Sequence, residues 1–169
     1  MDIQEKYKLV SVLLRYPSSD MKEAVEEIEF SDIEDANIVE FLEYFKNKPL
    51  MDLEEEYVRS FDLSNKASLY LTYHKFQDDP KRGSYLSKLV DYYRKKGFEF
   101  VENELPDFLP IVLEFISFLD EETAGQILVS FEPELNQIKK GLQDMNSKYL
   151  PLINFVIDTI PSREVKQND

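Results

Sequence analysis

Apolar residues recur at helical spacing along most of this chain, and prolines and polar turns divide the pattern into short blocks. In the first block Tyr7, Val10 and Leu14 lie three and four positions apart, and Pro17 ends the run. Only four glycines occur, and strand-like alternation is limited to residues 98–101, which lack a partner strand and are expected to form a connector. The pattern therefore predicts an all-α fold.

The prolines and polar turns also predict the extent of the domain and the positions of its helices. We expect a compact single-domain bundle of about eight to ten helices over residues 1–160, followed by a flexible C-terminal tail at residues 161–169. The first expected helix runs from Ile3 until Pro17, the second starts after residues 18–20 and runs toward Ile28, and the third follows residues 31–32 and ends before Asn47. The others are expected over about 51–61, 66–76, 82–96, 108–119, 121–131, 134–146 and 149–160.

Charge and composition exclude several classes of partner and site. With 20 basic and 34 acidic residues, the formal net charge is −14, which argues against nucleic acid as a partner and leaves solubility or a cationic partner as explanations. No stretch reaches the ~20 apolar residues of a membrane span. The N-terminus also lacks a signal-peptide pattern, so we expect a cytoplasmic protein with no stable membrane insertion. The absence of cysteine excludes disulfides, thiolate catalysis and cysteine-bound metals.

The sequence offers no recognisable catalytic site. His74 is the only histidine, and it is expected to be a polar residue packed beside Tyr70, because no Gly-x-Ser-x-Gly segment lies near it. No Glu-x-x-His pair is present, which removes the di-iron class of helical bundle, and the glycines are too scattered for a phosphate loop. We therefore expect no enzyme activity, no metal site and no bound cofactor.

Residues 104–115 (ELPDFLPIVLEF) combine a helix start with two acids inside an apolar run. Pro106 disfavours helix before it, Asp107 is expected to cap the helix, and Pro110 fits its first turn. Asp107 and Glu114 lie seven residues apart, which places them on nearly the same helix face. A buried helix has no packing reason to carry these acids, so we expect a basic group to meet them.

Four short motifs resemble those of one known family and occur in the same order. Each motif is weak alone, but together, over residues 9–119, they resemble the NarJ group of molybdoenzyme assembly chaperones, relatives of the TorD and DmsD chaperones. The motifs are LLRYP at 13–17, EEYVRSFD at 55–62, SLYLTYH at 68–74 with KRG at 81–83, and ELPDFLPIVLEF at 104–115.

The resemblance implies an all-helical chaperone for a respiratory molybdoenzyme such as nitrate reductase. Such a chaperone binds the N-terminal segment of the catalytic subunit and holds the subunit until molybdenum cofactor is inserted, before it docks on its membrane partner. Phe108 follows Asp107 where TorD and DmsD relatives commonly carry histidine, which favours the NarJ branch.

Two alternatives stay open at this point. One is a TorD-like or DmsD-like chaperone that binds the twin-arginine signal peptide of another molybdoenzyme, such as a dimethyl sulfoxide, thiosulfate or polysulfide reductase. The other is a non-catalytic helical scaffold in which the motif residues are core. The sequence is compatible with either a monomer or a domain-swapped dimer.

The residues expected to bind a peptide combine aromatic area with carboxylates, which suits an arginine-bearing amphipathic segment. The competing interpretation is structural: Tyr57 and Phe61 have ordinary core spacing, and Arg82 would pair with Asp107 or Glu114 inside the fold. The candidate peptide-binding residues are Glu56, Tyr57, Phe61, Tyr70, Tyr73, His74, Arg82, Asp107 and Glu114.

Overall fold

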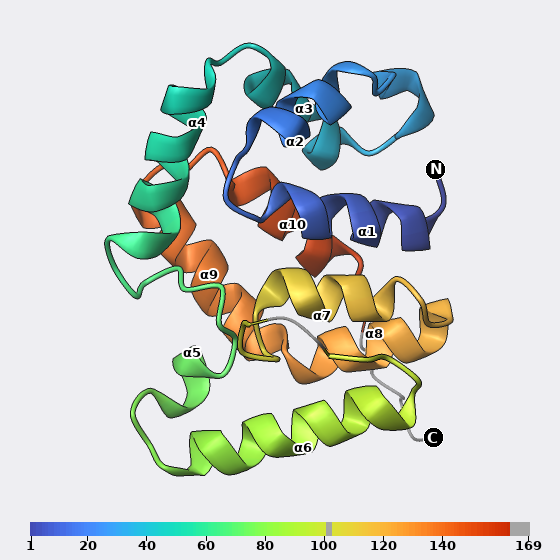
Figure 1. Ribbon diagram of the computed structural model, residues 1–169, viewed down its shortest axis with the longest axis vertical. Coiled ribbons are helices and arrows are strands. Elements are labelled where there is room, and N and C mark those ends of the chain that lie inside the picture. Colours follow the sequence, from blue (N-terminus) through green and yellow to red (C-terminus); the bar gives the residue numbers. More distant parts are fainter. Residues whose placement is uncertain (101–102, 163–169) are drawn as a thin grey trace, which may run out of the picture.

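The computed structural model describes residues 1–100 and 103–162 as a bundle of helices (Figure 1). Within these residues it contains ten α-helices, a 3-10 turn η1 (Phe30–Asp32), a π-helical turn η2 (Val58–Asp62) and no strand. The all-α prediction is confirmed. The helices are α1 (Ile3–Leu13), α2 (Ser19–Glu26), α3 (Ala36–Lys46), α4 (Leu50–Tyr57), α5 (Tyr73–Phe76), α6 (Lys81–Lys95), α7 (Leu109–Ile116), α8 (Glu121–Ser130), α9 (Glu132–Asp144) and α10 (Leu150–Asp158).

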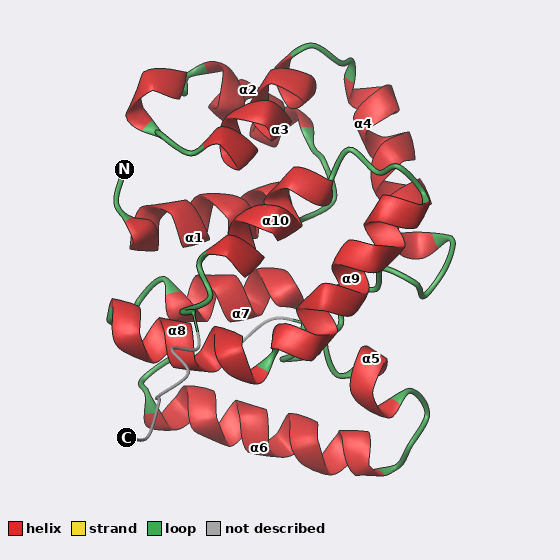
Figure 2. Cartoon of the chain, turned by 180° about the vertical axis from the view of Figure 1, so that it is seen from behind, coloured by secondary structure: helices red, strands yellow, loops and turns green. Residues whose placement is uncertain are grey.

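The most apolar helices lie at the centre of the bundle. In α7, seven of the eight residues are buried, because neighbouring helices cover it on several sides. α1 packs along α7, and α10 packs against both α3 and α9. Figure 2 shows α9 and α10 from the side opposite to Figure 1. From α6, Tyr93 reaches α7, where its ring centroid lies 4.6 Å from that of Phe115.

Side-chain caps fix where several helices begin. Asp2 accepts a hydrogen bond from the Glu5 backbone at 2.8 Å, and Glu5 accepts one from the Asp2 backbone at the same distance, so the pair forms a capping box. Ser18, Asp35 and Asp120 cap α2, α3 and α8 in the simpler one-way manner. These caps explain why the starts of the helices follow closely from local sequence.

The predicted helix at 66–76 is wrong over most of its length. Only Tyr73–Phe76 is α-helical, as α5, and the residues before it make turns and one isolated antiparallel bridge between Tyr70 and Phe108. The Leu109 N–H donates to the Leu69 carbonyl at 2.8 Å across this bridge. The segment is therefore held by a distant part of the chain, which satisfies backbone groups that a helix would otherwise pair internally.

The segment before α5 also lies tightly against α9. A side-chain carbon added at Gly141 of α9 would lie 2.5 Å from the Lys66 carbonyl oxygen. Glycine is therefore needed at this crossing, because any larger residue would meet backbone rather than a movable side chain. The approach places residues 65–72 between α9 on one side and the start of α7 on the other.

The last described residues run back over α8. A side-chain carbon added at Gly125 would lie 2.8 Å from the Pro161 ring. Most of the predicted flexible tail, residues 163–169, lies outside the described residues. No helix among the described residues is long and apolar enough to cross a membrane.

Candidate peptide-binding site

Asp107 lies inside the molecule and does not cap α7, so the expected cap is wrong. Its side chain is 0% exposed and accepts hydrogen bonds from the Thr72 backbone N–H at 2.9 Å and from the Thr72 hydroxyl at 2.6 Å. The N-cap position belongs to Phe108, which makes no side-chain cap hydrogen bond. Asp107 therefore ties the 66–72 segment to the start of α7 rather than facing solvent.

Arg82 completes this internal connection. Its Nε donates to the Thr72 hydroxyl oxygen at 2.9 Å, and a terminal guanidinium nitrogen lies 3.7 Å from the Asp107 carboxylate. The guanidinium also stands over the Tyr73 ring, 5.9 Å from its centroid. Of the two interpretations of Arg82, the internal pair with Asp107 is thus the one present. This pair holds the N-terminal turn of α6 against the segment before α7.

The other two acids also have partners within the chain. Glu114 lies 3.6 Å from the Arg15 guanidinium, and both side chains are about one-third exposed. Glu56 accepts from Arg59 at 2.6 Å and from the Lys148 backbone N–H at 2.9 Å, which joins α4 to the turn before α10. Asp107 and Glu114 are thus each met by an arginine of this chain, as expected for a basic group, but by two different ones.

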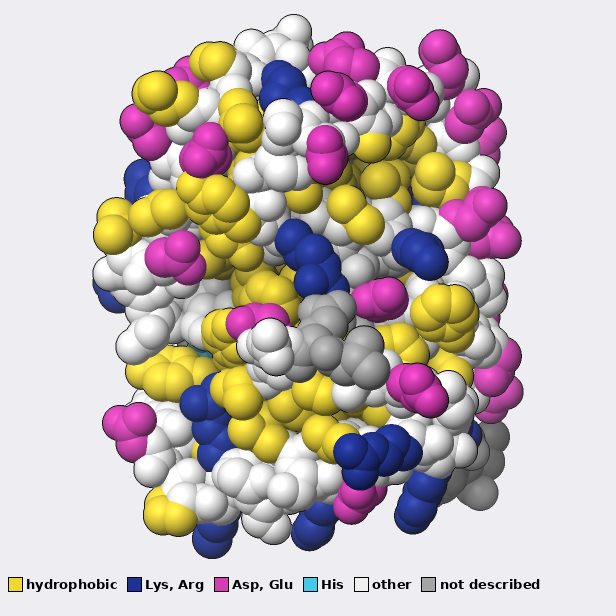
Figure 3. All heavy atoms as spheres, viewed as in Figure 1, with side chains coloured by type: hydrophobic (Ala, Val, Ile, Leu, Met, Phe, Trp, Pro, Cys, Tyr) yellow, Lys and Arg dark blue, Asp and Glu magenta, His cyan; other side chains and the backbone are white. Residues whose placement is uncertain are grey.

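Tyr57, Phe61 and Tyr70 lie together on the wall of a surface cavity of about 420 Å³, which we call the aromatic pocket. The pocket lies between the ends of α1 and α4, the 68–70 segment and the start of α7. Figure 3 shows hydrophobic side chains gathered over these elements on this face. The lining residues are Arg15, Tyr16, Tyr57, Phe61, Asp62, Ser68, Leu69, Tyr70, Glu104 and Phe108.

Contacts between aromatic rings hold the pocket wall together. The Tyr57 ring lies 5.5 Å from Tyr16 at an interplanar angle of 82° and 5.0 Å from Phe61 at 61°, and Tyr70 lies 5.0 Å from Phe108 at 31°. The Tyr57 hydroxyl donates to the Leu14 carbonyl at 3.1 Å, so its ring is held at both ends. Such rings offer broad apolar contact at low cost in side-chain entropy.

Two carboxylates give the aromatic pocket its charge. Partial desolvation by the pocket wall raises the pKa of the Asp62 carboxyl although the residue as a whole is exposed, and among the described residues no basic side chain pairs with it. Glu104 accepts a hydrogen bond from the Tyr70 hydroxyl, and burial and this bond together raise the pKa of Tyr70. Because Arg15 is engaged with Glu114, the pocket favours a cationic group with an apolar stem, such as arginine.

Exposed apolar side chains border the pocket. Tyr16 and Leu105 are 49% and 42% exposed, and Leu63, just after η2, is 74% exposed. The candidate list from sequence did not include Tyr16 or Glu104, although both lie within or beside the quoted motifs. Their proximity could have been inferred only if the 13–17 and 104–108 segments had been known to meet.

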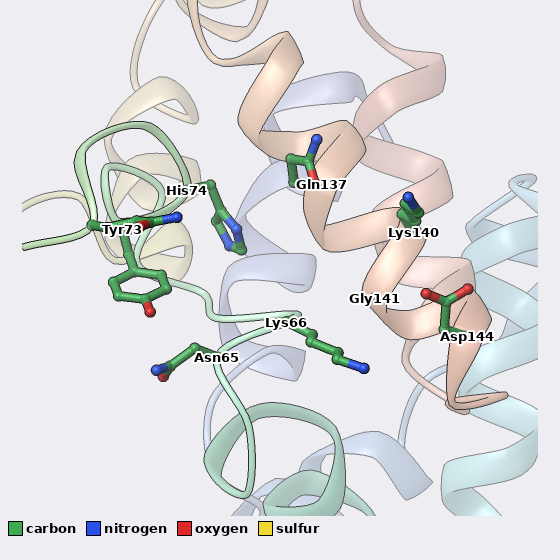
Figure 4. Close-up of a pocket in the computed structure, with 9 residues that line it drawn as sticks. Asn65, Lys66, Tyr73, His74, Gln137, Lys140, Gly141 and Asp144 are labelled. Carbon is green, nitrogen blue, oxygen red and sulfur yellow. The ribbon is translucent and has the colours of Figure 1, made fainter.

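Tyr73 and His74 belong to a different cavity, of about 400 Å³, which we call the polar pocket (Figure 4). His74 Nε2 lies 2.7 Å from the Ser68 carbonyl oxygen, and its ring lies 6.0 Å from that of Tyr73. The nine candidate residues therefore do not form one site. The polar pocket is lined by Asn65, Lys66, Tyr73, His74, Gln77, Gln137, Lys140, Gly141 and Asp144.

Comparison with known proteins identifies the family. The family model for the nitrate reductase delta subunit matches residues 30–154, about three-quarters of the chain. The chain belongs to the nitrate reductase delta subunit family. Membership confirms the resemblance to the NarJ group, and the match extends past residue 119, where no family motif was recognised in the sequence.

Two relatives with assigned names match most of this chain. It is 28% identical over 174 residues to the "Probable nitrate reductase molybdenum cofactor assembly chaperone NarJ" of Bacillus subtilis, covering 99% of this chain and 94% of that protein. It is 29% identical over 157 residues to the Escherichia coli K12 nitrate reductase molybdenum cofactor assembly chaperone NarJ, covering 88% and 66%. These relatives are named as chaperones rather than catalysts, which supports the prediction that the chain is not an enzyme.

A solved structure has the same fold. The crystal structure of a protein assigned as a redox enzyme maturation protein from Archaeoglobus fulgidus superposes with a TM-score of 0.69. The match covers 94% of this chain and 93% of that one at 22% sequence identity. At this identity the comparison bears on the arrangement of the helices and not on the residues of the site.

Proposed function

We propose that this protein is a dedicated assembly chaperone for a nitrate reductase-like molybdoenzyme and acts in the cytoplasm. It binds the N-terminal segment of the catalytic subunit, holds the subunit while molybdenum cofactor is inserted, and leaves before or as the enzyme docks on its membrane partner. The observation that carries the proposal is membership of the family along residues 30–154, with relatives over the full length that are named as such chaperones.

The aromatic pocket is the place where we expect the client segment to bind. Its volume of about 420 Å³ is within the range of ligand sites and can take one or two side chains of a peptide. An arginine of the client would lay its stem on Tyr57 and Phe61 and direct its guanidinium to Asp62. The exposed Leu63 and Leu105 then contact the apolar face of an amphipathic helix.

Release follows from competition and needs no chemical step. The pocket can bind the segment only while it is exposed in the unfinished subunit, so folding or docking that hides the segment lowers its affinity for the chaperone. Glu56, Arg82, Asp107 and Glu114 support this site indirectly, because their contacts hold α4, α6 and α7 against the segments that line it.

Calorimetric titration tests the proposal. The purified protein is titrated with N-terminal peptides of about 15–30 residues from molybdoenzyme catalytic subunits encoded near it, and micromolar binding, about −8 kcal/mol, to one of them is expected. Asp62→Lys should weaken that binding at least tenfold, about 1.4 kcal/mol. Glu23→Lys makes the same charge change at an exposed position of α2, away from the pocket, and should have no effect.

Three results would count against the proposal or redirect it. Silence toward every peptide, from a protein that melts cooperatively, favours the scaffold alternative. Binding that requires two adjacent arginines in the peptide favours a chaperone for a twin-arginine client. Equal weakening by Asp62→Lys and Glu23→Lys would show that general charge, and not the aromatic pocket, governs affinity. Light scattering with and without peptide distinguishes a monomer from a domain-swapped dimer.

A further inference from the structure

α6 carries a charge opposite to that of the molecule as a whole. The helix and the residue after it hold six basic side chains and one acid, Asp91, in a chain of net charge −14. Figure 3 shows these Lys and Arg side chains gathered along the edge of the molecule that α6 forms, whereas acidic side chains predominate around α2 and α3. The molecule therefore presents one basic edge.

This basic edge borders an apolar groove between α6 and α8. The groove has a volume of about 380 Å³, and none of its nine lining residues is acidic although 34 of the 169 residues are. Its floor is formed by partly buried aromatic and aliphatic side chains, and Lys88 is its one charged residue. The lining residues are Tyr85, Lys88, Leu89, Tyr92, Thr123, Gln126, Ile127, Ser130 and Phe131.

Three lysines share one face of α6, and the middle one, Lys88, lines the groove. Lys81, Lys88 and Lys95 are spaced seven residues apart, about two turns of 3.6 residues, so they lie along one edge of α6. Tyr85 and Tyr92 lie beside them on the groove face. All three lysines are exposed, and among the described residues none of them has an ion-pair partner.

The stability of α6 does not explain this row. Basic residues in the last turn stabilise a helix through its dipole, which accounts for Lys95. Lys88 lies in the middle of the helix, and Lys81 lies in the first turn, where a cation opposes the dipole. Helix stability therefore does not account for Lys81 and Lys88.

We propose that the groove between α6 and α8 is a second docking site, which binds an acidic amphipathic polypeptide segment of a partner protein. Aliphatic or aromatic side chains of the segment fill the groove over Tyr85, Leu89 and Tyr92. Its carboxylates, repeating every two helical turns, pair with Lys81, Lys88 and Lys95. The partner is a polypeptide and not a bilayer, because the apolar surface is recessed between two helices and the rest of the molecule repels anionic lipid.

The site differs from the aromatic pocket in both place and preference. The two share no lining residue, and the aromatic pocket favours cations whereas this groove favours anions. A client or partner that used both would be held by two segments of opposite charge, so that each site raises the local concentration for the other.

The probe is a fluorescein-labelled helical peptide of about 15 residues with a leucine stripe flanked by glutamates every seven positions. Fluorescence anisotropy with the full chain should give saturable binding that weakens with added salt. Lys88→Glu should weaken it at least tenfold, and Lys48→Glu, an equal change at an exposed site between α3 and α4, should not. Asp62→Lys should leave it unchanged, which separates this site from the proposed client pocket.

Control peptides, variants and lipid vesicles define the results that would contradict the proposal. Equal affinity for a glutamine-substituted peptide would mean that the lysine row plays no part. Binding that Lys88→Glu leaves intact, with the variant folded by circular dichroism, would place the peptide elsewhere. Lys88-dependent capture by phosphatidylserine vesicles that exceeds peptide binding would assign the edge to membrane contact. The double variant Lys81→Glu/Lys95→Glu must weaken the peptide further, or the role assigned to these two lysines is wrong.

Discussion

Replacing Gly141 with alanine sets two known effects of opposite sign against each other. Alanine in a helix interior is favoured over glycine by about 0.8–1 kcal/mol. The new methyl carbon, however, would lie 2.5 Å from the Lys66 carbonyl oxygen, 2.7 Å from its carbon and 3.1 Å from the Ala67 nitrogen. These are backbone atoms, so relief requires moving the 65–72 segment, and overpacking of this kind costs about 1–3 kcal/mol or more. Two of the contacts are shorter than 3.0 Å, so we expect the cost to lie at about 2–3 kcal/mol, which leaves a net loss of about 1–2 kcal/mol of stability after the helix gain.

Chemical and thermal unfolding measure this loss directly. For a chain of this length, such a change lowers the melting temperature by about 2–8 °C. Gly83→Ala is the matched control, because no atom lies within 4 Å of the added carbon, and it should raise stability by about 0.5–1 kcal/mol. Gly141→Ala should also weaken client-peptide binding, because Ser68, Leu69 and Tyr70 in the displaced segment line the aromatic pocket. A Gly141→Ala protein as stable as the Gly83→Ala protein would refute the close contact.

The remaining predictions concern single polar groups. Thr72→Val removes the hydroxyl that links Arg82 to the buried Asp107, so urea unfolding should show a loss of about 1–3 kcal/mol. Tyr57→Phe removes the hydrogen bond to Leu14 and should cost about 0.5–1.5 kcal/mol in the same assay, with peptide binding retained. Because the folded state raises the pKa of Asp62, its ionised form weakens folding at neutral pH. Asp62→Asn should therefore raise the melting temperature at pH 7, and this gain should vanish by about pH 3, below the ordinary value of 3.8; an equal gain at both pH values would contradict this origin.

Local sequence was sufficient for most of the helices. Nine of the ten predicted segments contain the observed α-helices to within a few residues at each end, because periodic apolar residues, prolines and capping side chains act over one or two turns. The failure at 66–76 has a different cause. Its apolar spacing suits a helix, but its backbone is paired with residues 107–109, about forty positions away, and no local pattern reports such pairing.

The candidate site was only partly accessible to sequence reasoning. Aromatic residues of the quoted motifs do line one pocket, as Tyr57, Phe61 and Tyr70. The buried position of Asp107 was missed, since an acid before a helix most often caps it. Tyr73 and His74 belong to α5, a single helical turn, and line the polar pocket together with residues of α9. The sequence did not show that these two residues lie apart from the aromatic pocket.

The sequence by itself determined the all-α class, the starts of most helices and membership of the nitrate reductase delta subunit family. These features depend on contacts within about two helical turns or on motif order, both of which can be read along the chain. Only the tertiary structure decided which acids meet which arginines, that Gly141 must pass the Lys66 backbone, and that Glu104 closes a pocket with Tyr70 and Asp62. Such contacts depend on the relative placement of distant helices, which the packing of the whole core sets at once.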